Sequence, residues 1–228
     1  MRIKLLNYTK NPEETVAQAA RLCYSTKTIG QIEKSIKDKK PDKIIAKIIK
    51  LGHFSVLEHV SFTFGIEGIS RVTSHQLVRH RLASFSQKSQ RYTRIEKKGQ
   101  FIIPEKIKSD SDFFLKFQEL SNKSFLLYQE MLTKGIPAED ARYILSQAIT
   151  TSIIFTANAR ELMHFFRLRC CNRAQWEIRE MAIEMLKIVK EIAPHIFATA
   201  GPSCLIGPCP EGEMSCGNPW TKANFKDN

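Results

Sequence analysis

The chain has 228 residues, of which 43% are hydrophobic and 25% are charged. This composition is typical of a globular protein and excludes a disordered or fibrous chain. Lysine and arginine outnumber the acidic residues by 35 to 23, which gives a formal net charge of +12. An excess of that size indicates an anionic partner, such as a nucleic acid, a membrane surface or a phosphorylated small molecule.

The first half of the chain alternates helical and extended patterns. We expect a helix over residues 11–24, because Asn, Pro and Glu follow one another at its start in the order of a helix cap. The isoleucines within residues 41–51 recur at helical spacing. Strict apolar and polar alternation over residues 60–66 predicts a half-buried strand. A helix over residues 70–81 and a strand within residues 91–103 complete this half.

The second half reads mainly as helices. A long one is expected over residues 111–134, with a glycine just past its end. Pro137 is expected to open another, and Asn158 followed by an acid three residues later is typical of a helix start. A last helix is expected over residues 173–199, which Pro194 should kink or interrupt.

These elements predict an α+β fold, a helix-rich domain around a small antiparallel sheet. We assign residues 1–200 to one domain and residues 201–228 to an irregular tail that contains Cys, Pro and Gly. The chain has no run of 18 apolar residues, and its N-terminus lacks the apolar stretch of a signal peptide. The cytosol is therefore the expected location.

Arginine is concentrated in two windows that hold only one lysine, Lys88. The first arginine window covers residues 71–94, with Arg71, Arg79, Arg81, Arg91 and Arg94. The second arginine window covers residues 160–179, with Arg160, Arg167, Arg169, Arg173 and Arg179. The planar fork of arginine suits phosphates, carboxylates and base edges, so the windows predict anion sites. The alternative is that these arginines form ion pairs with nearby glutamates.

The cysteines do not predict a disulfide framework, because the chain is long and carries no secretory signal. Cys204, Cys209 and Cys216 lie close together in the tail, but their spacing is not Cys-x-x-Cys and no histidine is near. We therefore expect no metal site, and reduced thiols or an optional disulfide are the favoured interpretation.

Glycine-rich nucleotide-binding loops and the serine nucleophile elbow are both absent. An anion must then be held by arginine side chains and helix N-termini. Residues 76–92 interleave cations, hydroxyls, amides and aromatics, a mixture that can bind a phosphate and a planar ring. Arg160, His164 and Arg167 repeat this chemistry on one face of a predicted helix.

Several of these segments resemble one family. Arg79-His80-Arg81, followed after seven residues by Ser89, is similar to the signature of the flavin-dependent thymidylate synthases. The segments Gly52-His53, Glu58-His59, Ser89 to Tyr92, Asn158 to Arg160 and Leu168-Arg169 agree with the same family in order and spacing. The resemblance covers about residues 1–200 and leaves out the tail.

The resemblance implies that the protein is a methyltransferase converting dUMP to dTMP. The carbon would come from 5,10-methylenetetrahydrofolate, and FAD reduced by NADPH would supply a hydride. It also implies an α+β homotetramer with active sites where subunits meet.

The same resemblance implies specific contacts. The expected dUMP-binding residues are Gln76, Leu77, Val78, Arg79, Gln87, Lys88, Ser89, Gln90, Arg91, Arg142 and Arg169. The expected FAD-binding residues are Ser55, Arg79, His80, Arg81, Gln87, Asn158, Ala159, Arg160 and His164. His53 and Tyr92 are folate candidates. Arg169 is the catalytic candidate, because a guanidinium can stabilise negative charge that develops on uracil.

Two other functions stay open on the sequence. Net charge and the mixture of arginine with aromatics are compatible with an RNA- or DNA-binding module. Against it, the arginines are confined to two windows and no known nucleic-acid-binding motif occurs, so we expect neither nucleic acid nor membrane as a partner. A flavin reductase without methyl transfer is the second alternative.

Overall fold

The computed structural model describes residues 1–37, 41–95 and 100–221. It divides into two compact units. Unit 1 consists of Met1–Arg2, Gly65–Arg79 and Phe85–Ile154. Unit 2 consists of Ile3–Phe64, His80–Ser84 and Phe155–Asn228.

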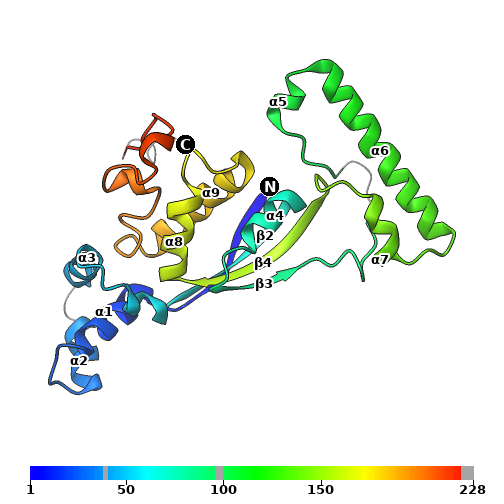
Figure 1. The fold of residues 1–228 in the computed structure, drawn as a ribbon. Coiled ribbons are helices and arrows are strands. Elements are labelled where there is room, and N and C mark those ends of the chain that lie inside the picture. Colours follow the sequence, from blue (N-terminus) through cyan, green and yellow to red (C-terminus); the bar gives the residue numbers. More distant parts are fainter. Residues whose placement is uncertain (38–40, 96–99, 222–228) are drawn as a thin grey trace. The chain divides into compact units, whose positions relative to one another are not determined.

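A small antiparallel sheet is formed by four strands in the order β1-β2-β4-β3 (Figure 1). The strands are β1 (Arg2–Tyr8), β2 (Ser61–Ser70), β3 (Ala83–Gln87) and β4 (Thr150–Asn158). By their residue ranges, β2 and β4 each contribute to both units. With the helices described below, this confirms the predicted α+β class.

The sequence predicted only β2, and its prediction of a strand within residues 91–103 was wrong for the described part. Residues 90–93 form a turn, and Phe101 makes a single antiparallel bridge with Ile149. Residues 96–99 lie outside the described part. The real strand, β3, was missed because its sequence Ala-Ser-Phe-Ser-Gln is short and mostly polar.

In unit 2, two short helices pack against a third, α1. The three are α1 (Pro12–Leu22), α2 (Ile29–Lys37) and α3 (Asp42–Lys50). The buried side chains of Ala17, Ile32 and Ile36 form a core against which Ile44 packs. Helical spacing of the apolar residues places them on one face of each helix. The sequence analysis did not predict α2.

Unit 2 also contains a core of aromatic rings. Phe62 of β2 contacts Phe197 edge to face with ring centroids 5.5 Å apart. Phe166 contacts Phe165 and Phe197 at centroid distances of 5.5 and 6.0 Å. Phe165 and Phe166 belong to α8 (Ala159–Arg169), so this core fixes the inner face of α8.

Unit 1 is dominated by the long helix α6 (Ser111–Thr133), which matches the predicted helix closely (Figure 1). The side chain of Asp110 caps it by accepting from the backbone N–H groups of its first turn. The buried side chains of Phe125, Tyr128 and Ala141 form its core. The described residues of this unit also form α4 (Arg71–Leu77), α5 (Glu105–Lys108), α7 (Ala138–Ala141) and a 3-10 helix, Arg142–Ile144.

Two predicted helices are shorter than expected. The helix predicted over residues 70–81 ends with α4 at Leu77, so the Arg79-His80-Arg81 triplet follows the helix instead of ending it. The predicted last helix is α9 (Trp176–Ile192), because Pro194 cannot continue it. In the tail, the described residues form two short 3-10 turns, Ser203–Leu205 and Gly212–Met214.

Candidate active site

Gln87 is the centre of a polar cluster in unit 1. Its amide nitrogen donates to Ser74 Oγ at 2.9 Å and to Thr151 Oγ1 at 3.3 Å. These bonds orient the side chain from β3 toward α4 and β4. Its amide nitrogen is thereby engaged, so a ligand would be met by the amide oxygen of Gln87.

Ser89 organises the turn that follows β3. Its hydroxyl oxygen accepts from the backbone N–H of Arg91 at 3.1 Å and of Tyr92 at 3.3 Å. The Arg91 guanidinium forms an ion pair with Glu139. The Arg91 side chain is 55% exposed, so this pair is weak and an anion could replace it.

Two further arginines of unit 1 form a positive site. Burial lowers the pKa of Arg71, and the charge of Arg142 lowers it further. Arg142 Nε donates to the backbone oxygen of Glu139 at 3.0 Å, which fixes the side chain beside a like charge. An anion bound here would relieve that repulsion, so the pair is suited to a phosphate or carboxylate.

Two expected dUMP contacts at the end of α4, Leu77 and Val78, differ in their exposure. Leu77 is 0% exposed, backbone included, so this predicted contact is not accessible to a ligand. Val78 is exposed and follows α4 as its C-cap.

A pocket of about 390 Å³ in unit 2 brings three predicted residues together. It is lined by Ser55, by the folate candidate His53 and by Arg160. Arg160 forms an ion pair with Glu58, which comes from the same 3-10 helix as Ser55, Phe54–His59. The pocket joins a hydroxyl, an imidazole and a guanidinium, a donor set that fits an anionic group.

The pocket residue Arg160 belongs to the first turn of α8. Asn158 is the N-cap, and its side chain accepts from the backbone N–H of Glu161 at 2.8 Å. This confirms the helix start predicted at Asn158. Ala159 is 0% exposed and its N–H donates to the carbonyl oxygen of Val60 at 2.9 Å, so of these two predicted contacts only the half-buried Asn158 is accessible to a ligand.

His80 lies at the centre of a buried hydrogen-bonded row in unit 2. Its Nδ1 pairs with Glu161 Oε1 at 3.1 Å, and its Nε2 accepts from Arg169 Nε at 3.0 Å. Phe165 and His164 flank the imidazole edge to face, with centroids at 5.0 and 5.9 Å. His80 and Glu161 are both buried, at 4% and 5% exposure.

Electrostatics keep this imidazole neutral. Burial lowers the pKa of His80, the hydrogen bond that His80 donates to Glu161 opposes this, and the charge of Arg169 lowers the pKa further. An arginine donates only, so the bond from Arg169 requires an unprotonated Nε2. Ligand atoms of His80, Glu161 and His164 lie within 4.8 Å of one another. Because both ring nitrogens of His80 are engaged, the cluster acts as a hydrogen-bonded chain.

Beyond this row, α8 carries the exposed residue His164. The Nδ1 of His164 lies 3.4 Å from Nη2 of Arg167. This confirms that these two side chains share a helix face. Arg81, another predicted FAD contact, is exposed and precedes β3.

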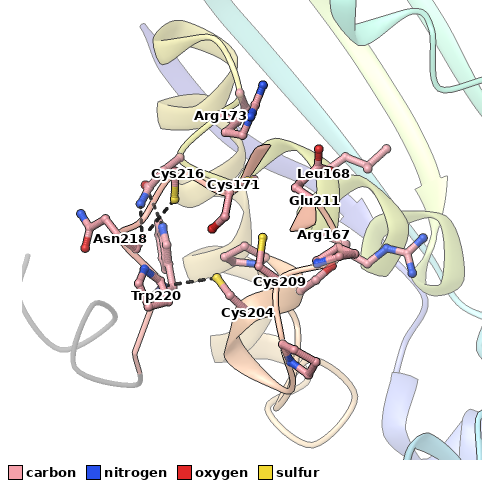
Figure 2. A pocket seen from close by; sticks show the side chains of 18 of the residues that line it. Arg167, Leu168, Cys171, Arg173, Cys204, Cys209, Glu211, Cys216, Asn218 and Trp220 are labelled. Atoms are coloured by element: carbon pink, nitrogen blue, oxygen red, sulfur yellow. Dashed lines mark hydrogen bonds between the residues drawn. The ribbon is translucent and has the colours of Figure 1, made fainter. Parts of the chain in front are cut away.

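A second pocket of unit 2, of about 510 Å³, lies between the end of α8 and the tail (Figure 2). Cys171, Cys204, Cys209 and Cys216 line it, together with Arg167, Arg169 and Arg173. Trp220 holds the tail in place, since its Nε1 donates to Asn172 Oδ1 at 2.9 Å. Among the described residues, no three thiols bring their sulfur atoms within 4.8 Å of one another.

The predicted site residues divide between the units. Unit 1 holds the expected dUMP-binding residues except Arg169, and unit 2 holds the expected FAD-binding residues except Arg79 and Gln87. The partners that hold these residues, namely Glu58, Arg71, Ser74, Thr151 and Glu161, were not predicted as such from the sequence. Three of them carried a signal: Glu58 stands in a family-like segment, Arg71 in the first arginine window, and Glu161 is the acid of the predicted helix start, whose carboxylate contacts His80.

No helix among the described residues is long and apolar enough to cross a membrane. The chain matches a family model described as "Thymidylate synthase complementing protein" over residues 4–195. It is 52% identical over 218 residues to the flavin-dependent thymidylate synthase of Geobacter sulfurreducens, covering 95% of this chain and 94% of that protein.

Two other relatives carry the same name. The protein of Clostridium tetani is 48% identical, over 95% of this chain and 93% of the relative. The protein of Pyrococcus furiosus is 45% identical, over 94% of this chain and 91% of the relative. With the family match over most of its length, the chain belongs to the family of flavin-dependent thymidylate synthases.

Proposed function

We propose that the protein makes dTMP by reductive methylation of dUMP, with a flavin as cofactor. 5,10-Methylenetetrahydrofolate is the carbon donor and NADPH reduces the flavin, which is FAD. The relatives are named flavin-dependent thymidylate synthases, and the buried row that orients Arg169 is the observation that carries the chemistry.

Unit 1 supplies the phosphate-binding chemistry. The like-charged pair Arg71 and Arg142 favours an anion. Arg91 is engaged by an exposed ion pair with Glu139 and by the ring of Tyr92, whose centroid lies 5.2 Å from the Arg91 Cζ. Gln87 is held by Ser74 and Thr151, so it is oriented before a ligand arrives. Pre-orientation reduces the entropy that binding costs. We assign dUMP recognition to these residues together with Ser89 and the end of α4.

Arg169 is the proposed group that stabilises negative charge during the reaction. Its guanidinium stabilises negative charge on a uracil carbonyl, which favours the pyrimidine form whose C5 attacks the activated methylene. This route needs no covalent bond to the enzyme. Burial raises the pKa of the Cys170 thiol to about 12, so the neighbouring thiol stays protonated and is no nucleophile.

The flavin is assigned to residues of unit 2. Ser55 and Arg160 line one pocket, and the N-terminus of α8 begins at Ala159. Together they offer a guanidinium and a hydroxyl near the positive end of a helix, which suit a diphosphate. When bound, the flavin supplies the hydride that completes the methyl group.

The oligomeric state and the domain boundaries of the protein belong to the same proposal. We assign a homotetramer, with residues 1–200 as the catalytic domain and residues 201–228 as its tail. His53 lines the same pocket as Arg160, and Tyr92 is 79% exposed, so both can meet a folate ring.

The test begins with the purified protein and its visible absorption spectrum. We expect a bound flavin, and dTMP formation that requires dUMP, 5,10-methylenetetrahydrofolate and NADPH together. NADPH oxidation without dTMP would indicate a flavin reductase. A colourless protein that binds RNA or DNA would overturn the proposal.

A further inference from the structure

Glu161, His80 and Arg169 form one continuous row inside unit 2. Glu161 lies in the first turn of α8 and Arg169 is its last residue, so about two turns of helix separate them. Helical side chains point toward the N-terminus, so Arg169 can reach back along its own helix. His80, from the segment after α4, bridges them with bonds of 3.1 and 3.0 Å.

The hydrogen bonds of this row run in one order of donor and acceptor. The carboxylate of Glu161 only accepts, so its bond to Nδ1 places the hydrogen of the neutral ring there. The lone pair is then on Nε2, the atom that accepts from Arg169 Nε. Glu161 thus selects the single tautomer of His80 that can hold the arginine.

The surroundings leave the imidazole little freedom. Phe165 and His164 pack edge to face against it, and only 4% of His80 is exposed. Arg169 itself is partly exposed and lines the pocket of about 510 Å³. A rigid acceptor at Nε fixes the plane of the guanidinium, because the group is planar.

We propose that Glu161 is a positioning residue, which acts through the tautomer of His80 to orient the guanidinium of Arg169. The inference rests on the proposed function, in which Arg169 polarises the uracil ring. It gives His80 a role toward Arg169 in addition to the flavin contact expected from the sequence.

Glu161→Gln tests the row with almost no change in shape. A glutamine amide can donate to Nδ1 as well as accept from it, so the tautomer with hydrogen on Nε2, which offers Arg169 no acceptor, becomes available. We expect flavin content to be retained and kcat to fall roughly 10–100-fold, as for other groups that orient a functional histidine. The KM for dUMP should change less than kcat.

The pH profile separates positioning from a structural role. Protonation of His80 Nε2 at low pH also removes the acceptor for Arg169. We therefore expect kcat, plotted against pH, to fall toward low pH, and we call this fall the acid limb. Glu161 favours the imidazolium, so Glu161→Gln should move this acid limb to lower pH. Glu13→Gln is the matched control, because Glu13 is another carboxylate of unit 2 that pairs with a histidine, with Oε2 lying 2.7 Å from His195 Nδ1. This control substitution should lower the free energy of unfolding without shifting the acid limb of the kcat profile.

Substitutions of His80 test which of its two ring nitrogens must accept from Arg169. In His80→Asn the amide takes the place of Nδ1, whereas in His80→Gln it takes the place of Nε2 and can accept from Arg169. We expect His80→Gln to retain more turnover than His80→Asn. In the His80→Gln background Glu161→Gln should have little further effect, because the two residues act in series.

A crystal structure of Glu161→Gln decides the inference independently of activity. We expect the bond between Arg169 Nε and His80 Nε2 to be lost. If that bond persists, or if turnover and acid limb equal those of the wild type, the proposal is overturned. A flavin-loaded wild type that forms no dTMP contradicts the proposed function instead, and the crystal structure still shows whether Glu161 positions Arg169.

Discussion

The two arginine windows are alike in sequence but differ in how the fold holds their side chains. In the second window, Arg160 pairs with Glu58 and Arg169 donates to His80, both within unit 2. In the first window, Arg71 lies beside the like charge of Arg142, which lowers its pKa. Arginines with fixed partners are suited to orientation, and arginines near a like charge are suited to binding an anion.

Two other arginines of the second window have fixed partners as well, in this case backbone carbonyls. Arg179 Nη1 donates to the carbonyl of Asn172 at 2.8 Å, and Arg173 contacts the carbonyl of Met214 in the tail. The second window therefore also stabilises the loop after α8. Its arginines are partly structural, as the alternative of local pairing suggested, although their partners are distant in sequence or are backbone groups.

The largest effect is expected from Arg169→Ala. Removing a donor that stabilises charge in the transition state typically lowers turnover by about 10²–10³. Flavin content should persist, because the assigned flavin contacts are elsewhere on α8. Single-turnover dTMP yield measures the effect, and Arg169→Lys should recover little because lysine lacks the planar fork. A normal yield from Arg169→Ala would remove the residue from the chemistry.

Arg142→Ala tests the other side of the comparison. Losing a bond to a charged group costs about 1.5–3 kcal/mol, or roughly 10–100-fold in affinity. We expect the KM for dUMP to rise by that factor while kcat changes little. Arg94→Ala, an exposed arginine of the first window, is the control and should leave KM unchanged. If Arg142→Ala lowers kcat as much as it raises KM, the distinction between the anion site of Arg71 and Arg142 and the fixed arginines of the second window is lost.

Arg160→Ala should weaken flavin binding without altering dUMP affinity in the flavin-loaded enzyme. The lost charge-assisted bond corresponds to a roughly 10-fold or larger decrease in affinity. Equilibrium dialysis with FAD measures it. Glu58→Gln is the matched control, since it removes only the partner of an exposed pair. If Glu58→Gln weakens FAD binding as much as Arg160→Ala, the arginine is structural.

Stability should depend on the protonation of His80. Its pKa in the folded protein is lowered from 6.5, so the unfolded chain takes up the proton first as pH falls. The free energy of unfolding should therefore decrease as pH drops below 6.5, until the folded protein also titrates. Urea titrations at several pH values measure this slope, and His80→Gln should flatten it. An unchanged slope in that variant would contradict the assignment.

The smallest effect is expected at Cys170. Burial raises the pKa of its thiol to about 12, so a thiol reagent at mildly alkaline pH should leave it unmodified in the native protein. The exposed thiols of Cys23 and Cys216 provide the internal control. A variant without cysteines, if it folds and binds flavin, should still form dTMP. Rapid labelling of Cys170 in the native state would contradict the assignment.

Local sequence determined the helices and the residue types of the site. Asn158 begins α8 because its side chain accepts from the N–H of Glu161, and Pro194 ends the last helix because it lacks a donor. The long helix α6 followed from apolar periodicity and a glycine past its end. Strand β3 and helix α2 were not predictable in this way, because β3 is short and mostly polar and because short segments rely on tertiary contacts.

The sequence by itself thus determined which side chains could bind anions and, through the resemblance of its motifs, the family. Only the tertiary structure decided which partners hold them. His80 lies between Glu161 and Arg169 although about 80 residues separate it from Glu161 along the chain. Such pairings depend on how the chain folds back on itself, and the energy of a buried charge depends on the groups that then surround it. No local pattern encodes either property.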